Sequence, residues 1–136
     1  SQSMPPGGII KNRRIFKTRH FARWMRKTEL TDVALSAAVH EMSQGLIDAD
    51  LGGGLVKKRV GIAGRGKRAG ARTLIATNQH SRWFFVFGFE KNERANIDVD
   101  ELEALKELAE QLLVRSDEEV EVALVDGALK EICHEN

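Results

Sequence analysis

The chain lacks the residues that would make it a disulfide-bonded or membrane-spanning protein. Cys133 is the single cysteine among 136 residues, so no intrachain disulfide can form, and this suits a reducing compartment. No apolar run approaches the roughly 18 residues that a membrane-spanning helix requires. The N-terminal region also lacks the apolar segment of a secretory signal. These absences predict a cytoplasmic protein with no membrane partner.

Tyrosine is absent, and the sequence offers no pattern for a metal or a nucleotide cofactor. The four histidines are widely spaced and match no metal-ligand motif, so we expect neither a metal nor a cofactor. Residues 61–68 nearly fit the phosphate-loop pattern. They fail at the last position, where Arg68 replaces the required Ser or Thr. A nucleotide hydrolase is therefore not expected.

Charge is distributed very unevenly along the chain. Residues 1–94 hold 18 Lys and Arg against 7 Asp and Glu, whereas residues 95–136 hold 3 against 13. A block this basic is typical of proteins that bind polyanions. Alternatively, the acidic segment folds back and neutralises the basic part. Both can hold, because a segment can cover one basic face and leave another open.

Hydrophobic periodicity and capping signals predict an α+β protein. The predicted elements are a short N-terminal strand at 14–18, helices at 21–25 and 31–43, long strands at 55–62, 71–78 and 82–89, and one or two acidic helices after Asp98 and Ser116. Consecutive strands with short loops form antiparallel neighbours, so we expect an antiparallel sheet of three long strands plus the short N-terminal strand. The helices are expected to cover its apolar face and leave the other face open.

The cations of the long strands fall on one face of this predicted sheet. Lys57 and Arg59 share a face of the first long strand, Arg72 begins the second, and Lys91 and Arg94 follow the third. The alternative is an ordinary solvated sheet face with scattered cations. A convergent cluster would suit RNA cleavage, because arginine matches phosphate geometry and a lysine can act as a base when neighbouring cations lower its pKa.

Four stretches of the sequence resemble the RelE/ParE superfamily of type II toxins, in particular its RelE-like or HigB-like translational repressors. They are Phe21–Trp24, the run from Gly45 through Asp50 to Arg59, Ala71–Leu74, and Phe87–Ile97, the last being the most distinctive. The resemblance implies a RelE-like single domain, which we place at residues 14–115. Residues 1–13 are interpreted as a cloning remnant and loose tail, and residues 116–136 as an acidic C-terminal helical extension.

The resemblance also implies an activity and a set of roles. Such toxins are endoribonucleases (mRNA interferases) that cut mRNA without a metal, often on the ribosome, inhibit translation, and are silenced by a cognate antitoxin. Lys57, with Lys58 and Arg59 beside it, matches the family's base and phosphate ligand. Arg72 matches the residue that stabilises the transition state. Lys91 matches a further basic residue, with Arg94 as a second candidate.

Stacking and backbone contacts are assigned less directly. Some members of the family stack a tyrosine on a base, and since this chain has none, Phe89 or His80 is expected to take that role. Arg65 and Lys67, in the glycine-rich basic loop, are candidates for contacts to the RNA backbone.

Two other functions remain open from the sequence. ParE-like relatives share the fold but block DNA gyrase without cutting RNA, because fold alone does not determine function. An RNA-binding module without cleavage would also explain a basic sheet face.

Overall fold

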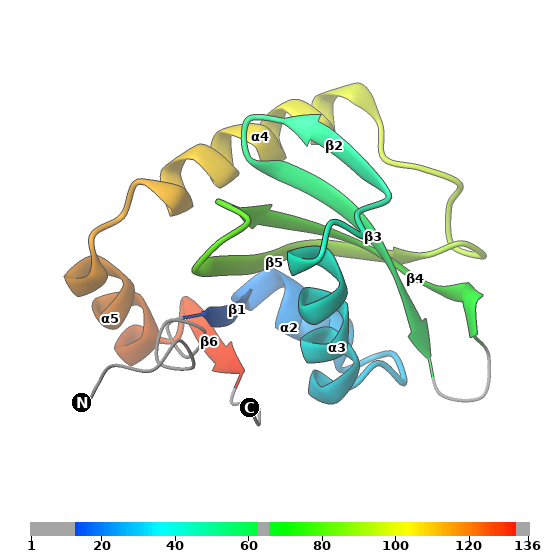
Figure 1. Ribbon diagram of the computed structural model, residues 1–136, viewed down its shortest axis with the longest axis horizontal. Helices are drawn as coiled ribbons and strands as arrows, with labels where there is room; N and C mark the ends of the chain where they lie inside the picture. The colour runs from blue at the N-terminus through cyan, green and yellow to red at the C-terminus, as the bar shows by residue number, and fades with distance from the viewer. Residues whose placement is uncertain (1–12, 63–65, 133–136) are drawn as a thin grey trace.

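The computed structural model describes residues 13–62 and 66–132 as one sheet with helices on both sides (Figure 1). In chain order the elements are β1 (Arg14–Thr18), α2 (Arg19–Met25), α3 (Asp32–Ser43), β2 (Ala49–Gly52), β3 (Leu55–Ile62), β4 (Gly66–Thr77), β5 (Arg82–Glu90), α4 (Val99–Leu113), α5 (Asp117–Asp126) and β6 (Leu129–Ile132). The α+β class is therefore confirmed. No helix of the described part has the length and apolar character needed to cross a membrane.

The sheet has six strands in the order β2-β3-β4-β5-β1-β6. The three long strands β3, β4 and β5 are antiparallel neighbours, as predicted. Strand β1 joins β5 in parallel, and β6 pairs antiparallel with β1. Strands β2 and β6 were not predicted. Each has four residues, too few for alternation to identify a strand.

Apolar side chains lie on both faces of the sheet, and helices cover both. Helices α2 and α3 pack on one face, where Trp83 and Phe85 are buried together with Leu35 and Val39. Helices α4 and α5 pack on the other, where Phe84 contacts the apolar cluster that includes Leu112 and Val120. The expectation of one open face was wrong, because Leu55, Leu74 and Ala76 make half of the second face apolar as well.

Polar residues cap the starts of the helices, at Asp98 and Ser116 as predicted. Thr31 accepts a hydrogen bond from the Ala34 N–H at the start of α3. Asp98 and Ser116 each form a complete capping box, at α4 and α5. Gly127 ends α5 with φ of 86°, a left-handed conformation that glycine adopts without strain. The chain then turns into β6.

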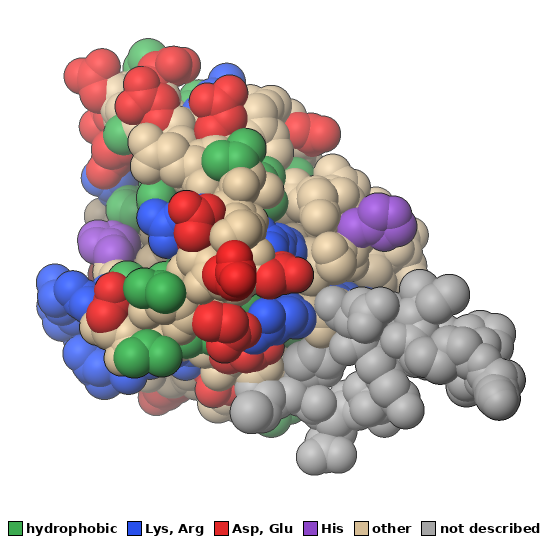
Figure 2. All heavy atoms as spheres, turned by 90° about the vertical axis from the view of Figure 1, so that its left-hand side faces the viewer, with side chains coloured by type: hydrophobic (Ala, Val, Ile, Leu, Met, Phe, Trp, Pro, Cys, Tyr) green, Lys and Arg blue, Asp and Glu red, His purple; other side chains and the backbone are tan. Residues whose placement is uncertain are grey.

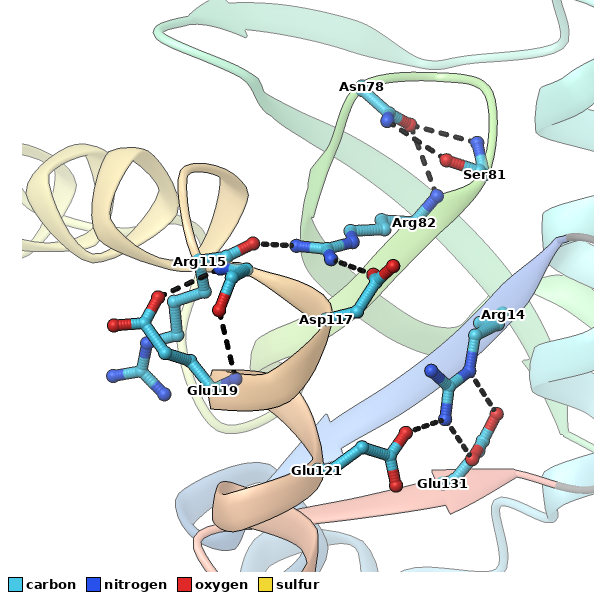
Figure 3. A network of polar contacts seen from close by, with 10 residues as sticks. Arg14, Asn78, Ser81, Arg82, Arg115, Asp117, Glu119, Glu121 and Glu131 are labelled. Carbon is cyan, nitrogen blue, oxygen red and sulfur yellow. Dashed lines mark hydrogen bonds and ion pairs between the residues drawn. The ribbon is translucent and has the colours of Figure 1, made fainter.

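Ion pairs attach the acidic C-terminal segment to the sheet (Figure 3). The Arg14 guanidinium on β1 donates to both carboxylate oxygens of Glu131, at 2.9 and 2.8 Å, and to Glu121 at 3.0 Å. These carboxylates raise the pKa of Arg14 further above its ordinary value. Arg82 donates to the Asp117 carboxylate at 2.5 Å and to the Arg115 carbonyl at 2.6 Å. The segment predicted as a helical extension thus holds a strand as well as a helix and completes the sheet.

Candidate nucleic-acid interface

Three of the predicted cations come together on β3 and β4. Arg59 and Arg72 are direct cross-strand partners, and Lys57 lies two residues before Arg59 on the same face. This is the face that α4 packs against, but the apolar contacts of α4 lie toward Leu55, Leu74 and Ala76. We call Lys57, Arg59 and Arg72 the basic cluster. It occupies the half of the face beyond those contacts.

The side chains of the basic cluster differ in their partners. Lys57 is half-buried, and its ammonium has no hydrogen-bond or ion-pair partner among the described residues. Arg59 is exposed, and its Nε lies 3.4 Å from Asp48, whose other carboxylate oxygen accepts from the Arg59 backbone N–H at 2.6 Å. Arg72 is half-buried. The cluster thus gathers three cations on one face, one of them beside the Asp48 carboxylate.

Lys58 does not belong to this surface. Its side chain points to the opposite face, under α3, and the residue is 5% exposed. The ammonium donates to the Leu46 carbonyl at 2.8 Å and pairs with Glu41 at 2.9 Å. The assignment of Lys58 as an RNA contact is therefore corrected, because its ammonium is bound by Leu46 and Glu41 inside the fold. Alternation along the strand puts Lys58 on this face, opposite to Lys57 and Arg59.

Aromatic and charged side chains meet near the end of β5. A register shift between Leu74 and Ile75 places both Phe87 and Phe89 on the face of the basic cluster, opposite Leu74 and Arg72. Phe89 is buried, with 3% of its surface exposed, whereas Phe87 is half-buried. The predicted stacking role of Phe89 is not compatible with this burial. Phe87 presents the more accessible ring.

Arg94 lies over Phe87 and forms an ion pair with α4. Its Cζ is 5.8 Å from the centre of the Phe87 ring, and its Nη1 donates to Glu101 at 2.6 Å. This hydrogen bond raises the pKa of Arg94 and, as the largest cause, lowers the pKa of Glu101, which also accepts from the Asp98 N–H. The pair ties the turn after β5 to the start of α4, so Arg94 is partly neutralised.

The remaining predicted cations lie at the edges of this surface. Lys91 is exposed in the turn that directly follows β5. Arg65 and the side chain of Lys67 lie outside the described residues. His80 lies in the turn before β5, at the opposite end of that strand from Glu90, so it is far from the basic cluster.

His20 was not singled out from the sequence, yet its ring lies on this side of the molecule. It is the second residue of α2 and stacks on Phe87, with ring centres 5.5 Å apart and planes within 7°. Its position two residues after the end of β1 brings it near β5, which could be recognised only once the parallel pairing of β1 and β5 was known.

A hollow of about 470 Å³ adjoins these two rings. It is lined on one side by α4 through Leu105 and Leu108, and elsewhere by Val86, Phe87 and His20. A hollow of this size is typical of sites that hold small molecules or single chemical groups. Among the described residues, no group of three or more His, Cys, Asp and Glu side chains is placed to hold a metal ion.

Comparison with known proteins identifies the family. The model of the RelE toxin of the RelE/RelB toxin-antitoxin system matches residues 13–132, and the chain therefore belongs to the RelE toxin family. No curated protein matches the sequence. Membership makes the chain a toxin of a toxin-antitoxin system, whose partner is a cognate antitoxin.

Proposed function

We propose that this toxin is an endoribonuclease that cuts mRNA and thereby inhibits translation. The observation that carries the proposal is the basic cluster: an arginine pair aligned across β3 and β4, with Lys57 beside it on the same face. Two guanidinium groups at this spacing can contact neighbouring oxygens of one phosphodiester, and Lys57 lies within reach of the same group.

The substrate can supply its own nucleophile, so the reaction needs no metal ion. Lys57 takes the proton from the ribose 2′-hydroxyl, and the 2′-oxygen attacks phosphorus. The P–O5′ bond breaks, which leaves a 2′,3′-cyclic phosphate on one fragment and a 5′-hydroxyl on the other. Arg72 and Arg59 stabilise the negative charge that grows on the phosphoryl oxygens, usually the largest contribution in such sites.

The leaving 5′-oxygen requires a proton, and the described surface offers a lysine for it. Lys91 is exposed directly after β5, whose residue Phe89 pairs with Arg72. We assign the proton donor to Lys91 on this position. Arg94 suits this role less well, since Glu101 holds its guanidinium and Phe87 lies beneath it.

The experiment is a cleavage assay with purified full-length chain and a 5′-labelled mRNA fragment, once without ribosomes in buffer that contains EDTA and once with ribosomes in buffer that contains magnesium. The proposal predicts cleavage in at least one of the two buffers and fragments that end in a 2′,3′-cyclic phosphate. A single 2′-deoxy substitution should abolish cleavage at that site, because the nucleophile is then missing.

Lys57→Met is compared with Lys130→Met, since Lys130 is an exposed lysine on β6 and the change in net charge is the same. Loss of a general base costs about 10²- to 10⁴-fold in rate, so Lys57→Met should be slower by that factor and Lys130→Met should match wild type. Intact RNA under all conditions, or equal loss in both variants, would contradict the proposal.

A further inference from the structure

Asp48 lies at the edge of the sheet beside two members of the basic cluster. It directly precedes β2, and its backbone N–H donates to the Lys57 carbonyl at 3.0 Å. Its carboxylate accepts from the Arg59 backbone N–H at 2.6 Å. Asp48 thus contacts β3 at both of the residues through which this strand contributes to the basic cluster.

The carboxylate takes the place of a strand partner at this point of the sheet. Strand β2 begins at Ala49, which pairs with Lys57, so the strand does not reach as far as Arg59. The Oδ2 atom of Asp48 accepts the N–H that β2 leaves without a partner. Because this short hydrogen bond fixes one carboxylate oxygen against the backbone, Oδ1 has a defined place beside the Arg59 side chain.

Asp48 contacts the guanidinium of Arg59 through Nε alone. The distance from Oδ1 to Nε is 3.4 Å, and neither Nη atom has a hydrogen-bond or ion-pair partner among the described residues. The side chain of Arg59 is 48% exposed. Since both Nη atoms carry N–H donors, those donors remain available to a ligand.

Arginines that join elements of the fold are held in another way. Glu131 accepts from both Nε and Nη2 of Arg14, at 2.9 and 2.8 Å, and Glu101 accepts from Nη1 of Arg94 at 2.6 Å. Those contacts occupy Nη atoms, which a phosphate would need. At Arg59 the carboxylate leaves them unused, as expected of a residue that orients a binding side chain instead of neutralising it.

We propose that Asp48 is a positioning residue of the basic cluster, which orients Arg59 so that its two Nη atoms face the bound phosphate. The inference rests on the proposed function, since it names a residue that acts through one member of the same site. Asp48 has no part in proton transfer, because both of its oxygens already accept from Arg59. A long side chain that is held beforehand loses less conformational freedom when the ligand binds.

The test separates the two contacts of the carboxylate. In Asp48→Asn the amide oxygen can still accept from the Arg59 N–H, whereas the amide nitrogen cannot accept from Nε. Asp50→Asn is the matched control, since Asp50 is an exposed aspartate on β2 that accepts from the Gly52 N–H at 2.9 Å, as an amide oxygen can. The two variants change the net charge equally, so the difference between them reports the contact with Nε.

Two quantities are measured on full-length chains. The first is the dissociation constant of a 2′-O-methyl oligoribonucleotide, which lacks the free 2′-hydroxyl and is not cut. The second is the cleavage rate at saturating concentrations of a 5′-labelled mRNA fragment, in the buffer in which the wild-type chain cuts. The chains are the wild type, Asp48→Asn and Asp50→Asn, together with Arg59→Met and the two double variants that combine it with each aspartate substitution.

The inference predicts that Asp48→Asn binds RNA about three- to ten-fold more weakly than Asp50→Asn, the cost of ordering one long side chain. Its cleavage rate should fall by a similar factor. In the Arg59→Met background the two aspartate variants should bind equally, because the contact that distinguishes them is gone. Both single variants should unfold at similar urea concentrations, since the Arg59 N–H keeps an acceptor.

Equal RNA affinities of Asp48→Asn and Asp50→Asn would overturn the inference. A difference that persists in the Arg59→Met background would also overturn it, since Asp48 would then act on the edge of the sheet and not through the guanidinium. A wild-type chain that binds RNA but never cuts it contradicts the proposed nuclease alone, and the affinities still decide the role of Asp48. A wild-type chain that does not bind RNA overturns both proposals.

Discussion

Lys57 and Lys58 are sequence neighbours for which the structure predicts opposite consequences of the same substitution. Lys57→Met should leave the free energy of unfolding unchanged within about 0.5 kcal/mol, because the side chain is half-buried and has no described polar partner. It should lower RNA affinity and reduce the salt slope of log K by about 0.7, the contribution of one phosphate contact. Lys58→Met should leave the RNA affinity and its salt slope unchanged.

The larger loss of stability is expected when Glu41, the ion-pair partner of Lys58, is substituted. The side chain of Lys58 is 6% exposed and that of Glu41 is 32% exposed, across a 2.9 Å ion pair. Removal of one partner of a buried pair costs about 3–5 kcal/mol, and because Glu41 is partly solvated we expect Glu41→Ala to cost about 2 kcal/mol. Lys58→Met should cost less than about 1 kcal/mol, since methionine fills the same apolar space and leaves no buried charge.

These differences in the free energy of unfolding are measured by urea denaturation. The chains compared are the wild type, Lys57→Met, Lys58→Met, Glu41→Ala and the Glu41→Ala/Lys58→Met double variant. The double variant should be more stable than Glu41→Ala alone, because it no longer buries an unpaired ammonium. The reasoning is refuted if Glu41→Ala is as stable as wild type, or if Lys58→Met reduces the salt slope of RNA binding as much as Lys57→Met does.

Three further predictions follow from single features of the fold. Gly88→Ala should lower stability by about 1–3 kcal/mol, measured by urea denaturation, since the added methyl would overlap the Trp24 ring; a Trp24→Leu background should reduce the loss. Glu101→Gln should flatten the acid side of the pH–stability profile, as circular dichroism from pH 6 to pH 2 would record. The pKa of Glu101 in the folded chain lies below its ordinary 4.5. Its contribution to stability is therefore present above pH 4.5 and is lost as the pH falls through the folded pKa. A chain that ends at Arg115 should not fold cooperatively, because it loses β6 and the buried Val120, Ala123, Leu129 and Ile132; a cooperative thermal transition near that of the full chain would contradict this.

The acidic surface explains how a chain with a net charge of +1 still has a basic face. Figure 2, which looks onto the end of the molecule where α5 lies, shows acidic side chains spread over this side. Their ion pairs with Arg14 and Arg82 neutralise part of the basic block, as the second of the two interpretations predicted. The basic cluster on β3 and β4 lies outside those pairs, so for this cluster a polyanion-binding face remains a prediction.

Local signals in the sequence predicted the local structure well. The three long strands and the helix starts at Asp98 and Ser116 depend on neighbouring residues and were found where expected. Alternation along β3 puts Lys58 on the same face as Val56 and Val60, but only the structure shows Glu41 and Leu46 as its partners.

Features that depend on distant parts of the chain could not be predicted. Strand β6 is four residues long and exists because β1 offers it an edge. The cover of the second face by α4 and the contact of His20 with Phe87 both follow from where β1 joins the sheet. The burial of Phe89 depends on how the neighbouring elements pack, which one strand cannot reveal.

The most direct test of the nuclease proposal is to express the wild-type chain and Arg72→Ala in bacteria and map the 5′ ends of cellular mRNA. Arg72 is the cross-strand partner of Arg59, and its loss should reduce cleavage by about 10²- to 10³-fold. The account predicts new 5′ ends inside coding regions with the wild-type chain and none above background with Arg72→Ala. Growth arrest with intact mRNA, or the same 5′ ends in both strains, would contradict it.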